Sequence, residues 1–322
     1  GRHSLRISLG GVGRHAEAAE AYAKAVAAGA SAAALALPRA TALSAAGCHA
    51  DAADVLAAAC EKKPKDANLA NARGVMLKRA GRLEEAERIL LAARRIDPRN
   101  AAICQNLGNV LELRGDQEGA AEAFGAGAKL DPRSAELWRL HGRMLQALGR
   151  MDAARAALEK SFAIDPRNRV LAGMLGQMLI EAGDREGALR IGAKLREAMP
   201  DDPAADILNA RTQLRLQRAA DAIATLEAVE ARHPGHRDAN MLLARIHGDG
   251  DRRLANEALE RALAAAPDDF EIMDALVESL SRSRYDDEVG HLERAYAISL
   301  RLIERHPDRV RQAARSLRTV FQ

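Results

Sequence analysis

Histidines and cysteines are the side chains in this sequence whose chemistry could bind a metal ion or form a covalent intermediate. Two histidines frame a short turn sequence, His233-Pro-Gly-His236, and no third or fourth ligand lies near them in the sequence. The cysteines are Cys48, Cys60 and Cys104, an odd number without a C-x-x-C pair. Their spacing fits neither a zinc site nor a disulfide framework. We therefore expect small thiols that fill the core, a histidine-containing turn, and no metal site.

Two glycine-containing segments share the outline of a nucleotide loop and of a calcium loop. Residues 11–16 read GVGRHA, which fits the G-x-G-x-x-A turn of a dinucleotide site after the alternating residues 5–9. No second strand follows, and no acidic residue stands about 20 residues later in a suitable context. Residues 247–253 read HGDGDRR but lack the later ligands and closing glutamate of a calcium loop. Since the common hydrolase, protease and kinase motifs are also absent, we expect no cofactor, no catalytic residue and no enzyme activity.

The sequence repeats with a period of 34 residues, and the repeated unit positions the side chains. Residues 81–100 read GRLEEAERILLAARRIDPRN, and residues 115–134 and 149–168 repeat this pattern position by position. Glycine recurs once in each unit, at Gly13, Gly47, Gly81, Gly115, Gly149 and Gly183. Proline recurs in the same way, at Pro64, Pro98, Pro132, Pro166, Pro200 and Pro234. A further small residue recurs at Gly74, Gly108, Gly142, Gly176, Ala210 and Ala244. Such self-similarity indicates an array of equal structural units.

Each recurring residue has a physical role in a pair of helices. The central glycine can adopt positive φ, which ends one helix and turns the chain into the next. The proline closes the unit because it cannot continue a helix. Between these marks, apolar residues such as Leu107, Val110 and Leu111 recur with helical spacing. Aromatic residues make up only 2% of the sequence, and alanine and leucine dominate its apolar part, which favours helix over strand. The sequence therefore predicts an all-α fold of helix–turn–helix units.

These units resemble the tetratricopeptide repeat (TPR), whose pattern is W-x2-L-G-x2-Y…A-x3-F…P. Three pairs of residues match it together with the prolines: Trp138 with Gly142, Leu107 with Gly108, and Ala120 with Phe124. Most of the other aromatic positions hold leucine or alanine. The resemblance implies a right-handed α-solenoid of stacked repeats, with the first helix of each repeat along a concave inner surface.

We expect one TPR solenoid over residues 1–322. Its predicted layout is a partial repeat at 1–32, regular repeats over 33–236, variant repeats over 237–308 and a capping helix at 309–322. In the variant repeats the proline spacing changes, and an insertion falls around Ser281–Asp287. The arginine-rich last segment suits a cap, because the end of a solenoid faces solvent.

The resemblance places a ligand on the concave surface, at the second, fifth, ninth and twelfth residues of each first helix. Amides and arginines at such positions are our predicted ligand-binding residues: Asn68, Asn71, Gln105, Asn109, Arg139, Arg143, Gln177, Arg211 and Arg245. Amides can donate to and accept from a peptide backbone, and arginine can hold carboxylates. The alternative is that these side chains form an ordinary solvated surface.

Repeats over nearly the whole chain without a catalytic motif favour a non-catalytic protein–protein interaction module. Its partner would be a peptide or protein segment with acidic residues. The alternative is the substrate-recognition region of a larger bacterial enzyme, such as a protein glycosyltransferase or sulfotransferase, with a further domain joined downstream. The 48 basic and 45 acidic residues give a net charge of +3, which argues against nucleic acid as the partner. No apolar run predicts a membrane span, and the cysteine usage fits a reducing, cytoplasmic location.

Overall fold

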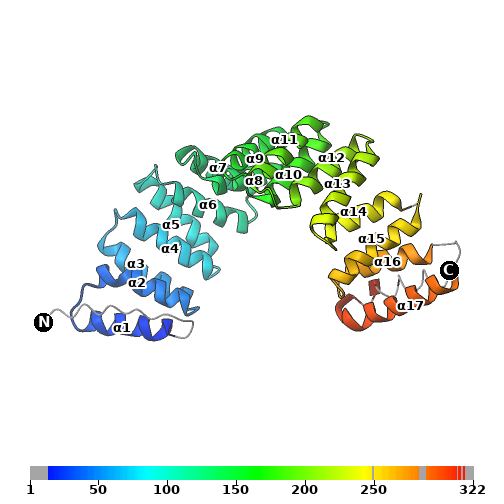
Figure 1. The fold of residues 1–322 in the computed structure, drawn as a ribbon. Coiled ribbons are helices and arrows are strands. Elements are labelled where there is room, and N and C mark those ends of the chain that lie inside the picture. Colours follow the sequence, from blue (N-terminus) through cyan, green and yellow to red (C-terminus); the bar gives the residue numbers. More distant parts are fainter. Residues whose placement is uncertain (1–13, 249, 283–287, 310, 313–314, 316–322) are drawn as a thin grey trace. The chain divides into compact units, whose positions relative to one another are not determined.

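The computed structural model describes residues 14–248, 250–282, 288–309, 311–312 and 315. These residues form seventeen α-helices joined by short turns, and no β-strand occurs among them (Figure 1). The prediction of an all-α fold built from stacked helical hairpins is confirmed.

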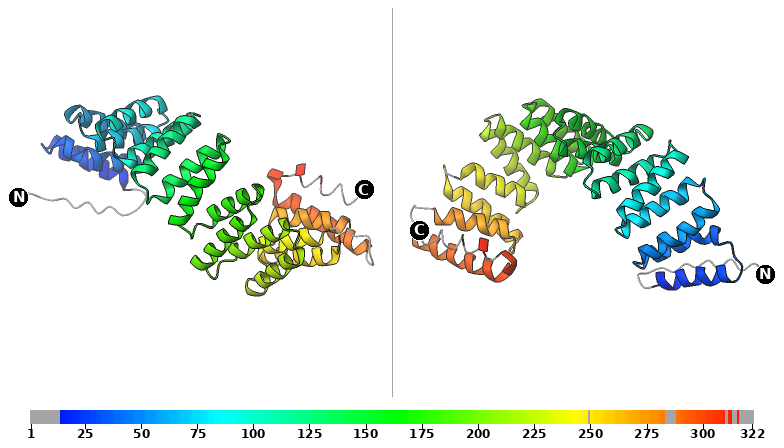
Figure 2. Two further views of the ribbon diagram at one scale, coloured as in Figure 1. Left: turned by 90° about the horizontal axis from the view of Figure 1, so that it is seen from above. Right: turned by 180° about the vertical axis from the view of Figure 1, so that it is seen from behind.

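The chain divides into two compact units, Gly1–Asp165 and Pro166–Gln322. The first unit contains α1 (His15–Ala27), α2 (Ala32–Ala45), α3 (His49–Lys62), α4 (Ala67–Arg79), α5 (Leu83–Ile96), α6 (Ala101–Leu113), α7 (Gln117–Leu130), α8 (Ala135–Ala147) and α9 (Met151–Ile164). The second unit contains α10 (Arg169–Glu181), α11 (Arg185–Ala198), α12 (Ala204–Arg215), α13 (Ala219–Arg232), α14 (Arg237–His247), α15 (Arg252–Ala265), α16 (Phe270–Ser281), α17 (Glu288–Arg305) and a short 3-10 helix, Pro307–Arg309. Within each unit, consecutive helices lie side by side in every view (Figures 1 and 2). Even-numbered helices are the first helices of their repeats, and odd-numbered helices are the second.

The first helices begin at capping residues that keep the 34-residue register. The caps of α4, α6, α8 and α10 are Asp66, Asn100, Ser134 and Asn168. Asn100 is representative: its Oδ1 accepts hydrogen bonds from the amides of Ala102 and Ile103 at 3.1 and 3.3 Å. Such a side chain satisfies amides that the first turn of a helix leaves without partners. The second residue after each of Pro64, Pro98, Pro132 and Pro166 therefore sets where the next first helix starts.

The turn inside each regular repeat depends on a residue with positive φ. Glycine supplies it in five successive turns, with φ between 73° and 84°, at Gly47, Gly81, Gly115, Gly149 and Gly183. In the next repeat the same register position holds Gln217, which adopts φ 59°. Because a side chain at positive φ costs about 1–2 kcal/mol, this turn carries backbone strain that the other five avoid.

Small residues let the two helices of a first-unit repeat approach closely. A Cβ atom added to Gly108 on α6 would lie 2.6 Å from a ring carbon of Phe124 on α7. A Cβ atom added to Gly142 on α8 would lie 2.6 Å from Cγ of Leu158 on α9. Phe124 and Leu158 are fully buried. The predicted small residues thus lie where the two helices of each hairpin pack against a buried side chain.

Trp138, the single tryptophan of the chain, lies on α8 in the first unit. Its indole N–H donates to the carbonyl of Pro132 at 3.1 Å. The ammonium group of Lys160, on α9, lies 4.2 Å from the ring centroid. A cation over the face of an indole is attracted by its π electrons. The tryptophan therefore ties α8 to the preceding turn and to α9.

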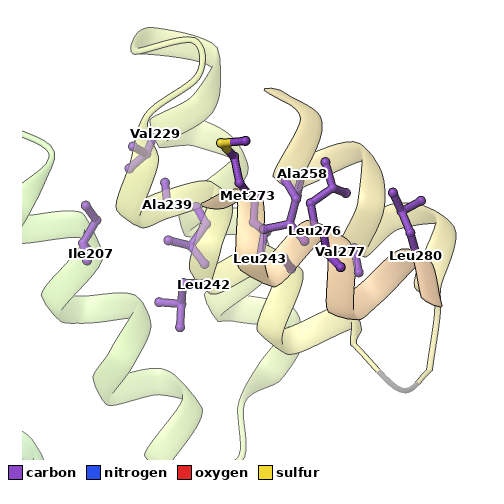
Figure 3. Packing of buried hydrophobic residues seen from close by; sticks show 14 of the residues in the cluster. Ile207, Val229, Ala239, Leu242, Leu243, Ala258, Met273, Leu276, Val277 and Leu280 are labelled. Atoms are coloured by element: carbon purple, nitrogen blue, oxygen red, sulfur yellow. The ribbon is translucent and has the colours of Figure 1, made fainter. Parts of the chain in front are cut away.

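The core of the second unit is continuous from α12 to α17 and consists mainly of leucine and alanine. Figure 3 shows Leu243, Met273 and Leu276 together where α14 and α16 meet. All three are at most 2% exposed. This packing fixes the first helices, whose other faces carry the surface considered below.

Parts of the predicted layout lie outside the described residues. They are residues 1–13 of the partial repeat, with the GVGRHA outline and the alternating segment, residues 283–287 of the insertion, and most of the predicted capping helix. Within the described part, α1 forms the end of the partial repeat, and Pro307–Arg309 is a 3-10 turn.

Candidate functional site

Three adjoining hollows lie along the first helices of the second unit. The first hollow is lined by α10, α12 and the start of α14, and its volume is about 320 Å³. The middle hollow is lined by α10, α12 and α14, and the last by α14, α15 and α16, with volumes of about 440 and 310 Å³. Arg211 and Asp238 line both of the first two, and Met241 and Arg245 line both of the last two. The hollows therefore form one surface, which we call the second-unit groove.

Two rows of side chains cross this groove, one helical turn apart. The row from the fifth residue of each repeat is Gly173, Ile207 and Met241. The row from the ninth residue is Gln177, Arg211 and Arg245. Residues four apart share one face of a helix. The groove thus has an apolar row beside a polar and basic one.

Three arginines of the middle hollow are not held by any carboxylate of the residues that the structure describes. Arg211, Arg215 and Arg245 are exposed, and none of them forms an ion pair with another described residue. Arg211 and Arg215 are four residues apart on α12, and Arg245 is on α14. Guanidinium groups gathered in one hollow repel one another and attract anions.

Arg237 lines the same hollow but is held by carboxylates. Its Nε donates to Asp269 at 2.8 Å and its Nη1 to Asp238 at 3.0 Å, and it also pairs with Glu271. The hydrogen bond to Asp269 outweighs burial and raises the pKa of Arg237 above its ordinary value. Because Asp269 also caps α16, this arginine joins α14 to the start of α16. Its role is structural, in contrast to the three unpaired arginines.

In the first unit, the structure pairs the predicted arginines with neighbouring glutamates. Arg139 donates to both carboxylate oxygens of Glu136, at 2.7 and 2.8 Å. That hydrogen bond raises the pKa of Arg139 above its ordinary value. Arg143 on α8 donates to Glu112 on α6 at 2.8 Å. These ion pairs neutralise part of the positive charge of Arg139 and Arg143. The two arginines therefore attract an anionic ligand less strongly than Arg211 and Arg245 do.

The predicted amides occupy different settings. Oδ1 of Asn71, on α4, accepts a hydrogen bond from Asn106 on α6 at 2.9 Å. Gln105 and Asn109 are half-buried on α6. Asn68 lines a separate hollow of the first unit, at the turn between α3 and α4. Gln177 is exposed in the second-unit groove and donates to Glu181 at 2.5 Å.

Of the predicted residues, Gln177, Arg211 and Arg245 are the ones that the structure brings together in the second-unit groove. Arg215 was not predicted from the sequence. Its position one helical turn after Arg211 on α12 could have indicated that it lies beside Arg211. The sequence also did not predict Val170, at the second position of its repeat, which lines the first hollow.

His236 and two of the three cysteines are built into the fold. Nδ1 of His236 accepts the amide N–H of Ala239 at 3.3 Å and caps α14. All three cysteines are free thiols. Cys104 is buried and Cys60 half-buried, but Cys48 is exposed at the turn before α3, so the prediction of a core-filling thiol is wrong for Cys48. Burial raises the pKa of Cys60 and of Cys104. Both thiols are therefore protonated and weakly nucleophilic at neutral pH. Within the described part of the chain, no three His, Cys, Asp or Glu side chains gather where they could hold a metal ion.

Two family models described as tetratricopeptide repeat match the sequence. One matches residues 37–101 and 106–169, and the other matches residues 145–206 and 179–246. The chain belongs to the tetratricopeptide repeat family. The matches cover more than half of it, including α10, α12 and most of α14 of the second-unit groove. No curated protein sequence matches this TPR chain.

Solved TPR structures resemble this chain in fold. The C-terminal part of a TPR repeat-containing protein from Cytophaga hutchinsonii is 18% identical, with a TM-score of 0.58, over 74% of this chain and 99% of that one. YrrB, described as a TPR protein with an unusual peptide-binding site, is 20% identical, with a TM-score of 0.47, over 58% of this chain and 96% of its own. The first likeness shows the TPR fold.

Across the ranges that the structure describes, none of the TPR helices combines the length and apolar character that crossing a membrane requires.

Proposed function

We propose that this chain is a non-catalytic protein-interaction module whose second-unit groove binds an acidic segment of a partner protein. One observation carries the proposal: Arg211, Arg215 and Arg245 are exposed in one hollow and form no ion pair among the described residues. Guanidinium groups are the preferred partners of carboxylates, which they can hold through two parallel hydrogen bonds. Carboxylates of a partner would supply the acceptors that these arginines do not find within the fold.

The charges at the groove predict how binding responds to solution conditions. Exposed charges steer the encounter of two proteins, and added salt screens them over about 10 Å or less. We therefore expect the affinity for an acidic segment to fall as the salt concentration rises. For the first unit, we propose that Asn68, Asn71, Gln105 and Asn109 offer hydrogen bonds to a peptide backbone. Arg139 and Arg143 would contribute less there, because glutamates already hold them.

Selection from a random peptide library, followed by affinity measurement, tests the proposal. We expect the full chain to enrich peptides rich in Asp and Glu. Those peptides should lose most of their affinity for the variant that carries Arg211→Glu and Arg245→Glu together. The matched control carries Lys194→Glu and Arg218→Glu, which make the same charge change at exposed positions on α11 and before α13. Enrichment without acidic residues, or equal binding to both variants, would contradict the proposal.

A further inference from the structure

The first hollow has an apolar notch next to the unpaired arginines. Val170 and Gly173 of α10 and Ile207 and Leu208 of α12 form this notch. Val170 is 69% exposed, the highest value among the large apolar residues in the described part of the chain. A Cβ atom added to Gly173 would meet no atom within 4 Å. The notch therefore combines apolar walls with empty space at the position of a missing side chain.

The repeat itself provides the comparison that makes the notch unusual. At the register position of Gly173, three of the four full first-unit repeats carry the polar residues Asn71, Gln105 and Arg139, and repeat 33–66 carries Leu37. At the register position of Val170 they carry polar or small residues: Asn68, Ala102 and Glu136. Repeat 169–202 thus has a large apolar residue and a missing side chain at two positions where no full first-unit repeat combines them. Removing an apolar side chain from water is favourable, so binding of a partner surface that covers Val170 is favoured.

Charge and apolar surface meet in one place here. Arg211 lines the first hollow together with the notch, and it also lines the middle hollow with Arg215 and Arg245. A ligand residue in the notch is therefore a near neighbour of ligand carboxylates that reach the arginines. Carboxylates alone would give weak, salt-sensitive binding at such an exposed site. An apolar side chain in a pocket is the kind of anchor that carries most of the energy of an interface.

We propose that the notch receives one bulky apolar side chain of the acidic segment, so that the ligand class is an acidic segment with an apolar anchor residue beside its carboxylates. This inference rests on the proposed function, because it deepens the description of the same groove. It assigns Val170 and Gly173 as specificity-determining residues. It assigns the carboxylate contacts to Arg211, Arg215 and Arg245.

Two fluorescent peptides test the anchor: a glutamate-rich peptide with a single central leucine, and the same peptide with serine in place of that leucine. We expect the full chain to bind the leucine peptide at least about tenfold more tightly, because burying a leucine side chain is worth about 1.5–3 kcal/mol. Gly173→Leu fills the notch, and Val170→Ser removes an apolar wall. Each should bring the two affinities close together while leaving the serine peptide bound as before.

The controls separate failure of the anchor from failure of the groove. Leu37→Ser makes an apolar-to-serine change at an exposed fifth-position residue of the first unit, and it should keep the leucine preference. Neither Val170 nor Gly173 is buried, so their variants should fold, which circular dichroism checks. If Arg211→Glu with Arg245→Glu weakens both peptides but leucine and serine bind alike, the anchor is wrong and the groove stands. If that charge reversal changes neither affinity, the groove assignment itself is wrong.

Discussion

Leu208 of α12 fills the space beside Gly176 of α10. Its Cδ1 occupies the space where a Cβ atom on Gly176 would stand. In the first unit, the equivalent glycine of α8, Gly142, receives Leu158 from the second helix of its own repeat. In repeat 169–202 the residue at the position of Leu158 is Gly192, which has no side chain to offer. The next repeat therefore supplies the leucine, and two repeats share one core position.

Replacing this leucine should weaken the repeat before its own. We expect Leu208→Ala to lower the free energy of unfolding by about 3 kcal/mol, since it leaves a cavity where α10 and α12 meet. Hydrogen exchange should show lost protection in α10 as well as in α12. The matched variant Leu158→Ala should lose protection in α8 and α9, within its own repeat. Unchanged exchange in α10 of Leu208→Ala would show that the contact does not support that helix.

The same substitution at two glycines should change stability in opposite directions. Gly142→Ala places a methyl group 2.6 Å from Cγ of Leu158 and 3.2 Å from the Ala154 carbonyl. We expect a loss of about 1–3 kcal/mol from this overpacking. Gly173→Ala meets no neighbour and should gain about 0.5–1 kcal/mol, because alanine favours helix. Urea unfolding of both variants measures the difference, and a shift of the same sign in both would contradict it.

Arginines of one hollow should separate into structural and binding residues. Arg237→Gln removes ion pairs to Asp238, Asp269 and Glu271. More than a third of the Arg237 side chain is exposed, so we expect a cost of only about 1 kcal/mol. Arg211→Gln removes an unpaired charge and should change stability by less than about 0.5 kcal/mol. Thermal unfolding without ligand distinguishes the two, and a larger loss in Arg211→Gln would show a partner inside the fold.

His141 should make the first unit less stable as the pH falls. Its Nδ1–H donates to the Ala121 carbonyl at 2.9 Å, and burial lowers its pKa below the ordinary value. The unfolded chain, with a histidine pKa of about 6.5, therefore takes up the proton more readily than the folded chain. Stability from this group is complete above that pH and is lost below it. His141→Gln should flatten the pH dependence of urea unfolding between about pH 7 and pH 5, and an unaltered slope would exclude His141 as its source.

The sequence predicted the repeating part of this fold because local chemistry determines it. Gly81 and Gly115 at positive φ, and Asn100 as a helix cap, follow from the backbone requirements of single residues. Gln217 shows the limit of that reasoning, since glutamine stands at the register position of glycine and adopts positive φ there as well. Helix positions were therefore predictable even where one residue departed from the pattern.

The candidate site was predicted only in part, because it depends on contacts between repeats. Arg143 and Arg211 occupy equivalent register positions two repeats apart, and the sequence makes both look equally basic. Glu112 pairs with Arg143, whereas no described residue pairs with Arg211. Whether an arginine is already paired with a glutamate or is available to a ligand depends on side-chain conformations, which the repeat register does not predict. The sequence also did not predict that Leu208, from the next repeat, fills the space beside Gly176. The register assigns that space to position 192, which holds glycine.

The position of Trp138 makes the two halves of the chain optically distinct. All indole emission arises from Trp138 on α8, whose ring contacts the Lys160 ammonium group and whose N–H donates to the Pro132 carbonyl. The second unit holds no tryptophan. Emission therefore follows the melting of one unit alone, whereas far-ultraviolet dichroism follows the helices of both. A difference between the two melting curves would report directly on whether the units unfold together.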